Sequence, residues 1–230
     1  MKYKIIGSTL PIVELTLDSG EKVYTQSGGM TYQTDGIDMT TNARGGIMGS
    51  LGRMFSGESL FLSNYTAQKD NAVIGFSATA PGSIMPLDLG SLPQGIILQK
   101  GAFLCGEDTV DLKAVFTKKI TAGLFGGEGF VLQHATGTGN LFIEVDGDTI
   151  EKELLPGEVL KVDTGNIVAF EPSVSYDIEM VKGVGNIILG GEGLFLAKLV
   201  GPGKVIIQSQ NFKDFAGRII PYIPTRSNND

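Results

Sequence analysis

The phrase Gly190–Leu196, with the sequence GGEGLFL, has two close relatives elsewhere in the chain. They are Ser56–Leu62 (SGESLFL) and Gly126–Leu132 (GGEGFVL), and successive phrases begin 70 and 64 residues apart. A phrase that recurs at such intervals is typical of one supersecondary unit that occurs several times in a chain. The sequence therefore predicts three internal repeats.

The similarity extends beyond this phrase. Gly137 recurs 64 residues later as Gly201, and the second and third copies keep that register over most of their length. The first copy is looser and has additional residues before its phrase. No Pro- or Ser-rich linker separates the copies, which favours a single body over residues 1–230 with a short polar C-terminal tail. We place the three repeats at about 5–80, 83–148 and 152–212.

The segments within each repeat are typical of β-strands. Val13, Leu15 and Leu17 alternate with polar residues, which is the pattern of a strand with one buried face. Short apolar runs bounded by glycine, such as 96–98 and 187–189, are typical of buried strands. No window of helical length has an apolar face with capping residues, and only 47–55 is compatible with a helical turn. The fold class indicated is all-β, with many short strands in sandwich or barrel units.

The composition weighs against several classes of protein. The formal net charge is −7, whereas nucleic-acid binders usually present a basic surface, so we expect no nucleic acid as a partner. The single cysteine, Cys105, excludes an intrachain disulfide and suits a reducing compartment. The first residues lack the apolar core of a signal peptide, and no apolar run is long enough to span a bilayer. We therefore expect a cytoplasmic protein.

Three glutamates recur within the repeated phrase, each beside a glycine. Either they gather near a local pseudo-threefold axis and bind a cation, or each accepts backbone N–H bonds from its own turn. We favour the structural role, because repeats copy turn-forming residues along with the fold. The residues assigned to this role are Gly57, Glu58, Gly127, Glu128, Gly191 and Glu192.

A second acidic group lies near the middle of the chain. Glu144, Asp146 and Asp148 alternate at the end of an expected strand, and Glu151 and Glu153 follow. Oxygen ligands at alternate positions suit Ca²⁺, but the calcium-binding loop with its terminal glutamate is absent. A solvated hairpin around residues 146–147 is the favoured interpretation.

The remaining candidates for chemistry are weaker. His134 is the only histidine, and the sequence shows no nucleophile or acid placed to form a catalytic set with it, so we interpret it as a surface or strand-end residue. The glycine-rich loops match neither the P-loop nor the dinucleotide-binding fingerprint. We predict no catalytic, cofactor-binding or metal-ligating residue, no cofactor, and no enzymatic activity.

One connector in the first repeat is unusual, because it is apolar, rich in glycine and interrupted by arginines. A segment of this kind is buried in the core, buried between subunits, or exposed to a protein partner or a membrane surface, and the sequence leaves these alternatives open. The candidate interaction residues are Ile47, Met48, Leu51, Arg53, Met54 and Phe55.

Residues 52–61 (GRMFSGESLF) and 101–104 (GAFL), within this three-copy glycine-rich pattern, resemble a family of uncharacterised proteins. The family includes the "altered inheritance of mitochondria" proteins of eukaryotes and many bacterial members. The resemblance covers nearly the whole chain and implies a fold like that of the tryptophan RNA-binding attenuation protein, related to the double-stranded β-helix. It also implies ring-shaped homo-oligomers, with a trimer favoured. It supplies no catalytic residue, and RNA binding does not carry over, because the basic rim of the attenuation protein has no clear counterpart in this acidic chain.

The expected function is that of a non-enzymatic β scaffold. Such a protein would form a ring-like assembly or organise a membrane surface from its periphery, with the 47–55 connector as its contact surface. The alternative is a small-molecule binding module with ligand sites between repeat units or between subunits, as the resemblance suggests.

Overall fold

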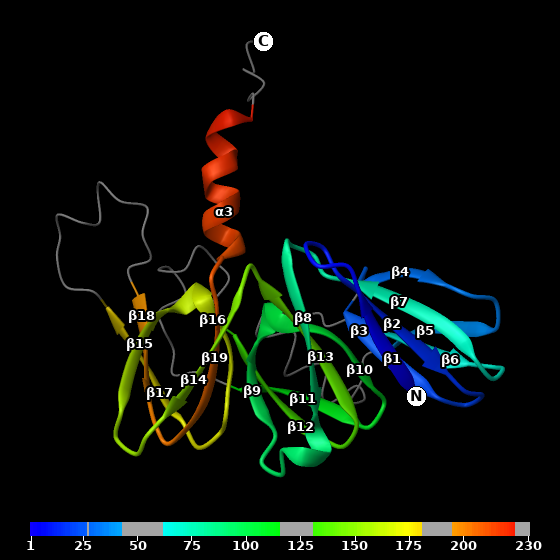
Figure 1. Cartoon of the computed structure of the whole chain (residues 1–230), viewed down its shortest axis with the longest axis horizontal. Coiled ribbons are helices and arrows are strands. Elements are labelled where there is room, and N and C mark those ends of the chain that lie inside the picture. Colours follow the sequence, from blue (N-terminus) through cyan, green and yellow to red (C-terminus); the bar gives the residue numbers. More distant parts are fainter. Residues whose placement is uncertain (27, 43–61, 116–130, 181–194, 224–230) are drawn as a thin grey trace.

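Short antiparallel strands make up almost all of the regular structure (Figure 1). The figure shows a computed structural model, which describes residues 1–26, 28–42, 62–115, 131–180 and 195–223. Within these residues nineteen strands form four antiparallel sheets, so the all-β prediction is confirmed.

Two sheets lie at opposite ends of the elongated molecule (Figure 1). Sheet A consists, in strand order, of β1 (Lys2–Ile6), β2 (Ile12–Leu17), β7 (Ala72–Ser77) and β4 (Met30–Gln33). Sheet D consists, in strand order, of β15 (Val159–Asp163), β18 (Phe195–Val200) and β17 (Ser175–Met180).

Two six-stranded sheets lie between them. Sheet B consists, in strand order, of β5 (Ile37–Asn42), β6 (Leu62–Ala67), β3 (Lys22–Gln26), β10 (Phe103–Glu107), β13 (Asn140–Asp146) and β8 (Gly82–Asp88). Sheet C consists, in strand order, of β11 (Val110–Val115), β12 (Leu132–Gly137), β9 (Ile96–Gln99), β16 (Ile167–Phe170), β19 (Gly203–Gln208) and β14 (Thr149–Leu154).

Three hydrophobic cores fill the spaces between successive sheets. The first core joins sheets A and B, the second joins B and C, and the third joins C and D. Fully buried pairs that represent the three cores are, in this order, Val13 and Phe142, Leu141 and Leu98, and Val205 and Leu199. The burial of these apolar side chains is the main stabilising contribution to the fold.

The position of a strand in this stack explains its sequence. Phe142 on β13 packs in the first core, whereas its neighbours Leu141 and Ile143 pack in the second. Consecutive residues of a strand point to opposite faces, so a strand covered on both faces is apolar throughout. Strand β2 has one buried face, and its burial alternates as its sequence predicts.

Strands β2 to β19 fall into three successive groups of six with the same pairing pattern. In each group the sixth strand pairs with the first and the third, and the fifth pairs with the second and the fourth. Neighbouring groups meet at two further pairings, β3 with β10 and β9 with β16, which we call the joints. The repeated glycines and glutamates lie between the fourth and fifth strands of each group, outside the described residues, so the threefold sequence repeat stays a prediction.

The α-helix α3 (Phe212–Ile219) follows β19 and projects from the body (Figure 1). The expectation of no helix outside 47–55 was wrong here. Phe212, Phe215 and Ile219 share one helical face, and Arg218 lies in the last turn, where a cation is favourable. The helix has only eight residues, and its pattern is short enough to be overlooked. Single 3-10 turns occur at η1 (Leu89–Ser91), η2 (Lys100–Ala102), η3 (Thr164–Asn166) and η4 (Ile220–Tyr222).

Candidate functional site

The residues with the most specific sequence pattern lie outside the described part of the chain. They are Gly57, Glu58, Gly127, Glu128, Gly191 and Glu192 of the repeated phrase, and Ile47, Met48, Leu51, Arg53, Met54 and Phe55 of the first connector. Their proposed roles stay predictions. The described structure instead tests the other polar groups, which lie within the sheets.

Glu144 is the most deeply buried carboxylate among the described residues, with 9 % of its surface exposed on β13. Its Oε2 accepts hydrogen bonds from the backbone N–H of Thr79 at 2.7 Å and from Thr79 Oγ1 at 2.9 Å. Burial raises the pKa of Glu144 above its usual range; the bonds from Thr79 oppose this shift, and the charge of Asp146 adds to it. Glu144 therefore attaches the loop between β7 and β8 to sheet B.

The raised pKa of Glu144 gives its effect on stability a definite sign. A carboxyl group whose pKa is higher in the folded state contributes stability below its unfolded pKa of about 4.3, and this contribution is lost as pH rises through the folded value. In Glu144→Gln the amide oxygen still accepts from Thr79, and no charge is buried. We therefore expect the free energy of unfolding of the variant, minus that of wild type, to rise as the pH increases from 4 to 8.

Urea denaturation of both proteins at several pH values measures this difference. An advantage of the glutamine variant that shrinks as pH rises would contradict the assignment.

Glu107 and Asn140 form a second polar link that the sequence analysis missed. Glu107 Oε1 on β10 accepts from the backbone N–H of Asn140 at 2.9 Å and from Asn140 Nδ2 at 2.6 Å. The two residues are far apart in sequence, and only the pairing of β10 with β13 brings them together. Their contact closes one end of that strand pair.

The acidic group 144–153 is not the hairpin that the sequence predicted. The chain turns at Gly147, where φ is +70°, but β13 and β14 belong to different sheets and do not pair. The turn is held by Gln208, whose Oε1 accepts from Asp146 N at 3.0 Å, and by Ser209, whose Oγ accepts from Asp148 N at 2.8 Å. Residues 146–149 therefore form a crossover between sheets B and C.

His134 on β12 has a structural partner. Its Nε2 lies 2.8 Å from the carbonyl oxygen of Gln94, which is a backbone group. His134 is half-buried and lies within β12, where it pairs with Ile97 of β9, and not at a strand end. The thiol of Cys105 is fully buried, and burial raises its pKa well above the ordinary value, so it behaves as a core residue.

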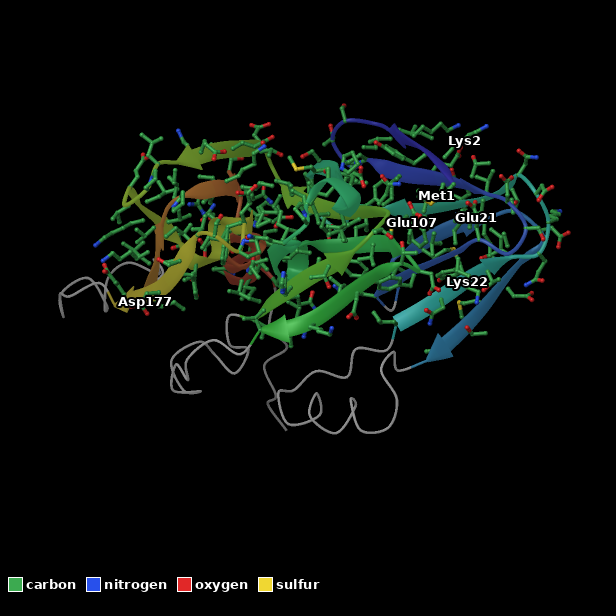
Figure 2. The ribbon with its side chains drawn as sticks, turned by 90° about the horizontal axis from the view of Figure 1, so that it is seen from below. Met1, Lys2, Glu21, Lys22, Glu107 and Asp177 are labelled. Carbon is green, nitrogen blue, oxygen red and sulfur yellow. The ribbon has the colours of Figure 1, made fainter. Side chains whose placement is uncertain are left out.

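The amino terminus takes part in an ion pair at the edge of the first core. Figure 2 shows Met1, Glu21 and Glu107 close together, and the Met1 amino group lies 2.5 Å from Glu21 Oε1. This hydrogen bond raises the pKa of the amino group, burial opposes the shift, and the nearby charge of Glu107 adds to it. The contact fastens the start of the chain to the turn between β2 and β3.

The polar groups considered above serve the architecture. Across residues 1–26, 28–42, 62–115, 131–180 and 195–223, no three His, Cys, Asp or Glu side chains gather closely enough to hold a metal ion. Every helix in that part of the chain is too short or too polar to cross a bilayer.

These features define an all-β protein of four stacked antiparallel sheets, whose buried carboxylate and amide groups hold turns and strand ends. The chain belongs to the family described as "Mitochondrial biogenesis AIM24", whose sequence model matches residues 3–210. The family resemblance noted from the sequence is thereby confirmed.

Two streptococcal proteins are similar to this chain. An uncharacterized protein of Streptococcus pyogenes serotype M6 is 34 % identical over 237 aligned positions, covering 99 % of this chain and 93 % of the relative. A crystal structure of a protein from Streptococcus pyogenes superposes with a TM-score of 0.78 at 29 % identity, covering 96 % of this chain and 99 % of that one. The fold is therefore shared with a protein solved by experiment.

Proposed function

We propose that this chain is a non-enzymatic β scaffold that assembles with copies of itself into a ring, with three copies favoured. The observation that carries the proposal is the arrangement of three hairpins, β5–β6, β11–β12 and β17–β18. Their strand ends that flank residues 43–61, 116–131 and 181–194 lie on one side of the body (Figure 2). We expect a partner or a membrane surface to be contacted on this side, with the 47–55 connector as the contact surface.

The polar groups support a scaffold rather than an enzyme. Glu107 and Glu144 are held by Asn140 and Thr79, and His134 by a backbone carbonyl. Catalysis needs a nucleophile, base or acid placed against a substrate, and these groups are occupied by structural contacts. The net charge of −7 favours a partner other than nucleic acid. We further propose that the protein is cytoplasmic and contacts membranes only at their surface.

Light scattering of the purified wild-type chain tests the assembly. We expect one species with a mass that is a multiple of 24.3 kDa, and three times that value for the favoured trimer. A clean monomer at micromolar concentration would rule out the ring. The result does not depend on any variant, because self-association is a property of the native chain.

Vesicle binding tests the contact surface separately. Apolar side chains at a membrane surface bind in proportion to the area they bury, so phosphatidylcholine vesicles should retain the wild-type chain and lose Met54→Asp. If the vesicles retain neither protein and Met54→Asp assembles normally, the 47–55 connector is not the contact surface.

A small-molecule binding module is the second candidate. Gln133 on β12 is 1 % exposed, and its Oε1 has no hydrogen-bond partner among the described residues. An unpaired buried acceptor is costly, and a ligand that donates to it would remove that cost. A melting-temperature screen against amino acids and metabolites tests this function, because a ligand that binds the native state raises the melting temperature. If no compound does so, the scaffold remains the better account.

A further inference from the structure

The two joints follow one rule. Each pairs the second strand of one group with the third strand of the next, β3 with β10 and β9 with β16, in antiparallel orientation. Cys105 lies opposite Thr25 in the first joint, and Ala169 lies opposite Leu98 in the second. Sheets B and C exist as six-stranded sheets only because of these pairings.

Two strands lack the neighbouring strand that this rule gives to their counterparts. In the described residues β15, the second strand of the last group, pairs only with β18, and β4, the third strand of the first group, pairs only with β7. They lie at opposite ends of the molecule (Figure 1), too far apart to pair within one chain. The other free edges differ. The fourth strands β5, β11 and β17 are outer strands in all three groups. The first strands β8 and β14 are outer strands of their sheets, and their counterpart β2 is covered by β1, which precedes the three groups and is itself an outer strand.

The exposure of β4 contrasts with that of its counterparts. A register shift marks the same place in each third strand, at Met30/Tyr32, Phe103/Cys105 and Ile167/Ala169. Cys105 and Ala169 are fully buried at the joints, whereas Tyr32 is 37 % exposed. The position that is internal in two groups is therefore open in the first.

The joints also predict how β15 and β4 would align. Phe170 lies opposite Ile97 in the second joint, one residue from the Ala169–Leu98 pair. On the third strands, the residue that directly follows the register shift and its first paired residue is Phe170 in β16 and Gln33 in β4, so Gln33 takes the place of Phe170. On the second strands, aligning β12 with β18 makes Lys161 of β15 the counterpart of Ile97 of β9. The predicted register sets Lys161 opposite Gln33.

The backbone of each strand agrees with this register. Thr34 N donates to Val73 O, so Thr34 faces β7 and the N–H and C=O of the preceding Gln33 face the free edge. Gly201 N donates to Glu158 O, so Glu158 faces β18. Backbone groups alternate along a strand, and those of Lys161, three residues later, therefore face the opposite, free edge. The register thus brings together two residues whose donors and acceptors both point outward.

We propose that β15 of one copy pairs antiparallel with β4 of a second copy of this chain, with Lys161 opposite Gln33. The pairing joins sheets D and A into one seven-stranded sheet and repeats the rule of the two internal joints. It is a head-to-tail contact, so an open row of copies keeps one free β4 at one end and one free β15 at the other until a ring closes. The inference rests on the proposed scaffold and names the strands that assemble it.

The opposite interpretation gives Lys161 a protective role. Lysine on an edge strand often prevents pairing, and Lys161 is exposed, with its Nζ 2.6 Å from Glu179 Oε2. Internal joints have Tyr24 and Ile97 at this place. A polar residue also keeps an edge soluble before it meets its partner, so Lys161 is compatible with pairing. The outward-facing backbone groups and the rule of the two joints favour pairing. The experiments below separate the two interpretations.

Gln33→Pro removes an N–H that faces the free edge and donates to nothing within sheet A. Proline is tolerated on an edge strand in this orientation, so the variant should fold and lose the assembly. Glu153→Pro on β14 is the matched control. Ser209 N donates to Asp148 O, so Asp148 faces β19. Because backbone groups alternate along a strand, the N–H of Glu153, five residues later, faces the outer edge of β14. We expect light scattering to find a monomer for Gln33→Pro and the wild-type mass for Glu153→Pro.

A disulfide tests the register without disrupting the strands. Residues directly opposite in a hydrogen-bonded antiparallel pair have Cα atoms about 5.5 Å apart, which a disulfide can span. Oxidised Gln33→Cys/Lys161→Cys should give covalent multimers on a non-reducing gel. Each single variant, and the control pair Gln33→Cys/Glu153→Cys, should stay uncrosslinked, while the native Cys105 is buried in all of them.

The outcomes distinguish the inference from the scaffold on which it rests. An oligomeric wild type with no disulfide in the double variant and no effect of Gln33→Pro would overturn the β15–β4 pairing and leave self-assembly standing. Crosslinks in either single variant would show a symmetric contact and would also overturn it. A monomeric wild type would remove both proposals.

Discussion

Phe142→Ala is expected to lower the free energy of unfolding by about 3–5 kcal/mol, because it empties a fully buried aromatic site. Phe142 lies on β13, between β10 and the edge strand β8 of sheet B, and faces the first core. Its ring also meets that of Tyr3 edge to face, with centroids 5.1 Å apart. The substitution therefore loses packing within the core and one contact to β1.

Urea denaturation measures this loss, and Phe142→Leu is the matched control. Leucine keeps much of the volume, so its cost should be clearly smaller than that of alanine. Equal losses for the two variants, or a loss below about 1 kcal/mol for alanine, would mean that Phe142 does not fill the core between sheets A and B.

Gly137→Ala is expected to destabilise the chain by more than about 2 kcal/mol, because two independent penalties act at one position. The backbone φ of Gly137 is +115°, a region that side-chain-bearing residues rarely adopt. A Cβ at Gly137 would lie 2.1 Å from the carbonyl oxygen of Thr109, which is backbone and cannot move aside cheaply. The turn between β12 and β13 would have to distort.

Gly20→Ala separates the two penalties. The φ of Gly20 is +87°, but nothing lies within 4 Å of its Cβ position. We expect a loss of about 1 kcal/mol from backbone strain alone. Thermal or urea unfolding of the two variants checks the difference, and a Gly20→Ala loss as large as that of Gly137→Ala would contradict the steric argument.

The sequence predicts the strands better than their arrangement. Alternation identifies β2, and the continuous apolar run Leu141–Ile143 identifies a buried strand, because the period of side-chain burial is local. Which strands pair is a long-range property, and this explains the mistaken hairpin at residues 146–147. Asp146-Gly147 forms a turn in either case, so local turn chemistry does not distinguish a hairpin from a crossover.

The polar contacts were harder to predict than the strands. Glu144 stands in an acidic, alternating segment that suggests solvent exposure, yet it is buried beside Thr79 from a distant loop. The link between Glu107 and Asn140 depends on the pairing of β10 with β13. No local pattern marks either contact, since each arises where strands from different parts of the chain meet.

The free edges could not be found from the sequence at all. Only the complete set of pairings reveals that strand β15 lacks the neighbour that its counterparts β3 and β9 have. The glycines and glutamates of the repeated phrase lie outside the described residues. Their proposed role in shaping turns is still a prediction.

Amide hydrogen exchange on the assembled wild-type chain tests the central claim most directly, because it reads the backbone N–H groups of the strand edges themselves. If the two ends of the chain pair as the joints do, the amides of Gln33 and Lys161 exchange slowly, while that of Glu153 on the outer edge of β14 exchanges rapidly. Exchange of Gln33 and Lys161 as fast as that of Glu153 would contradict the account.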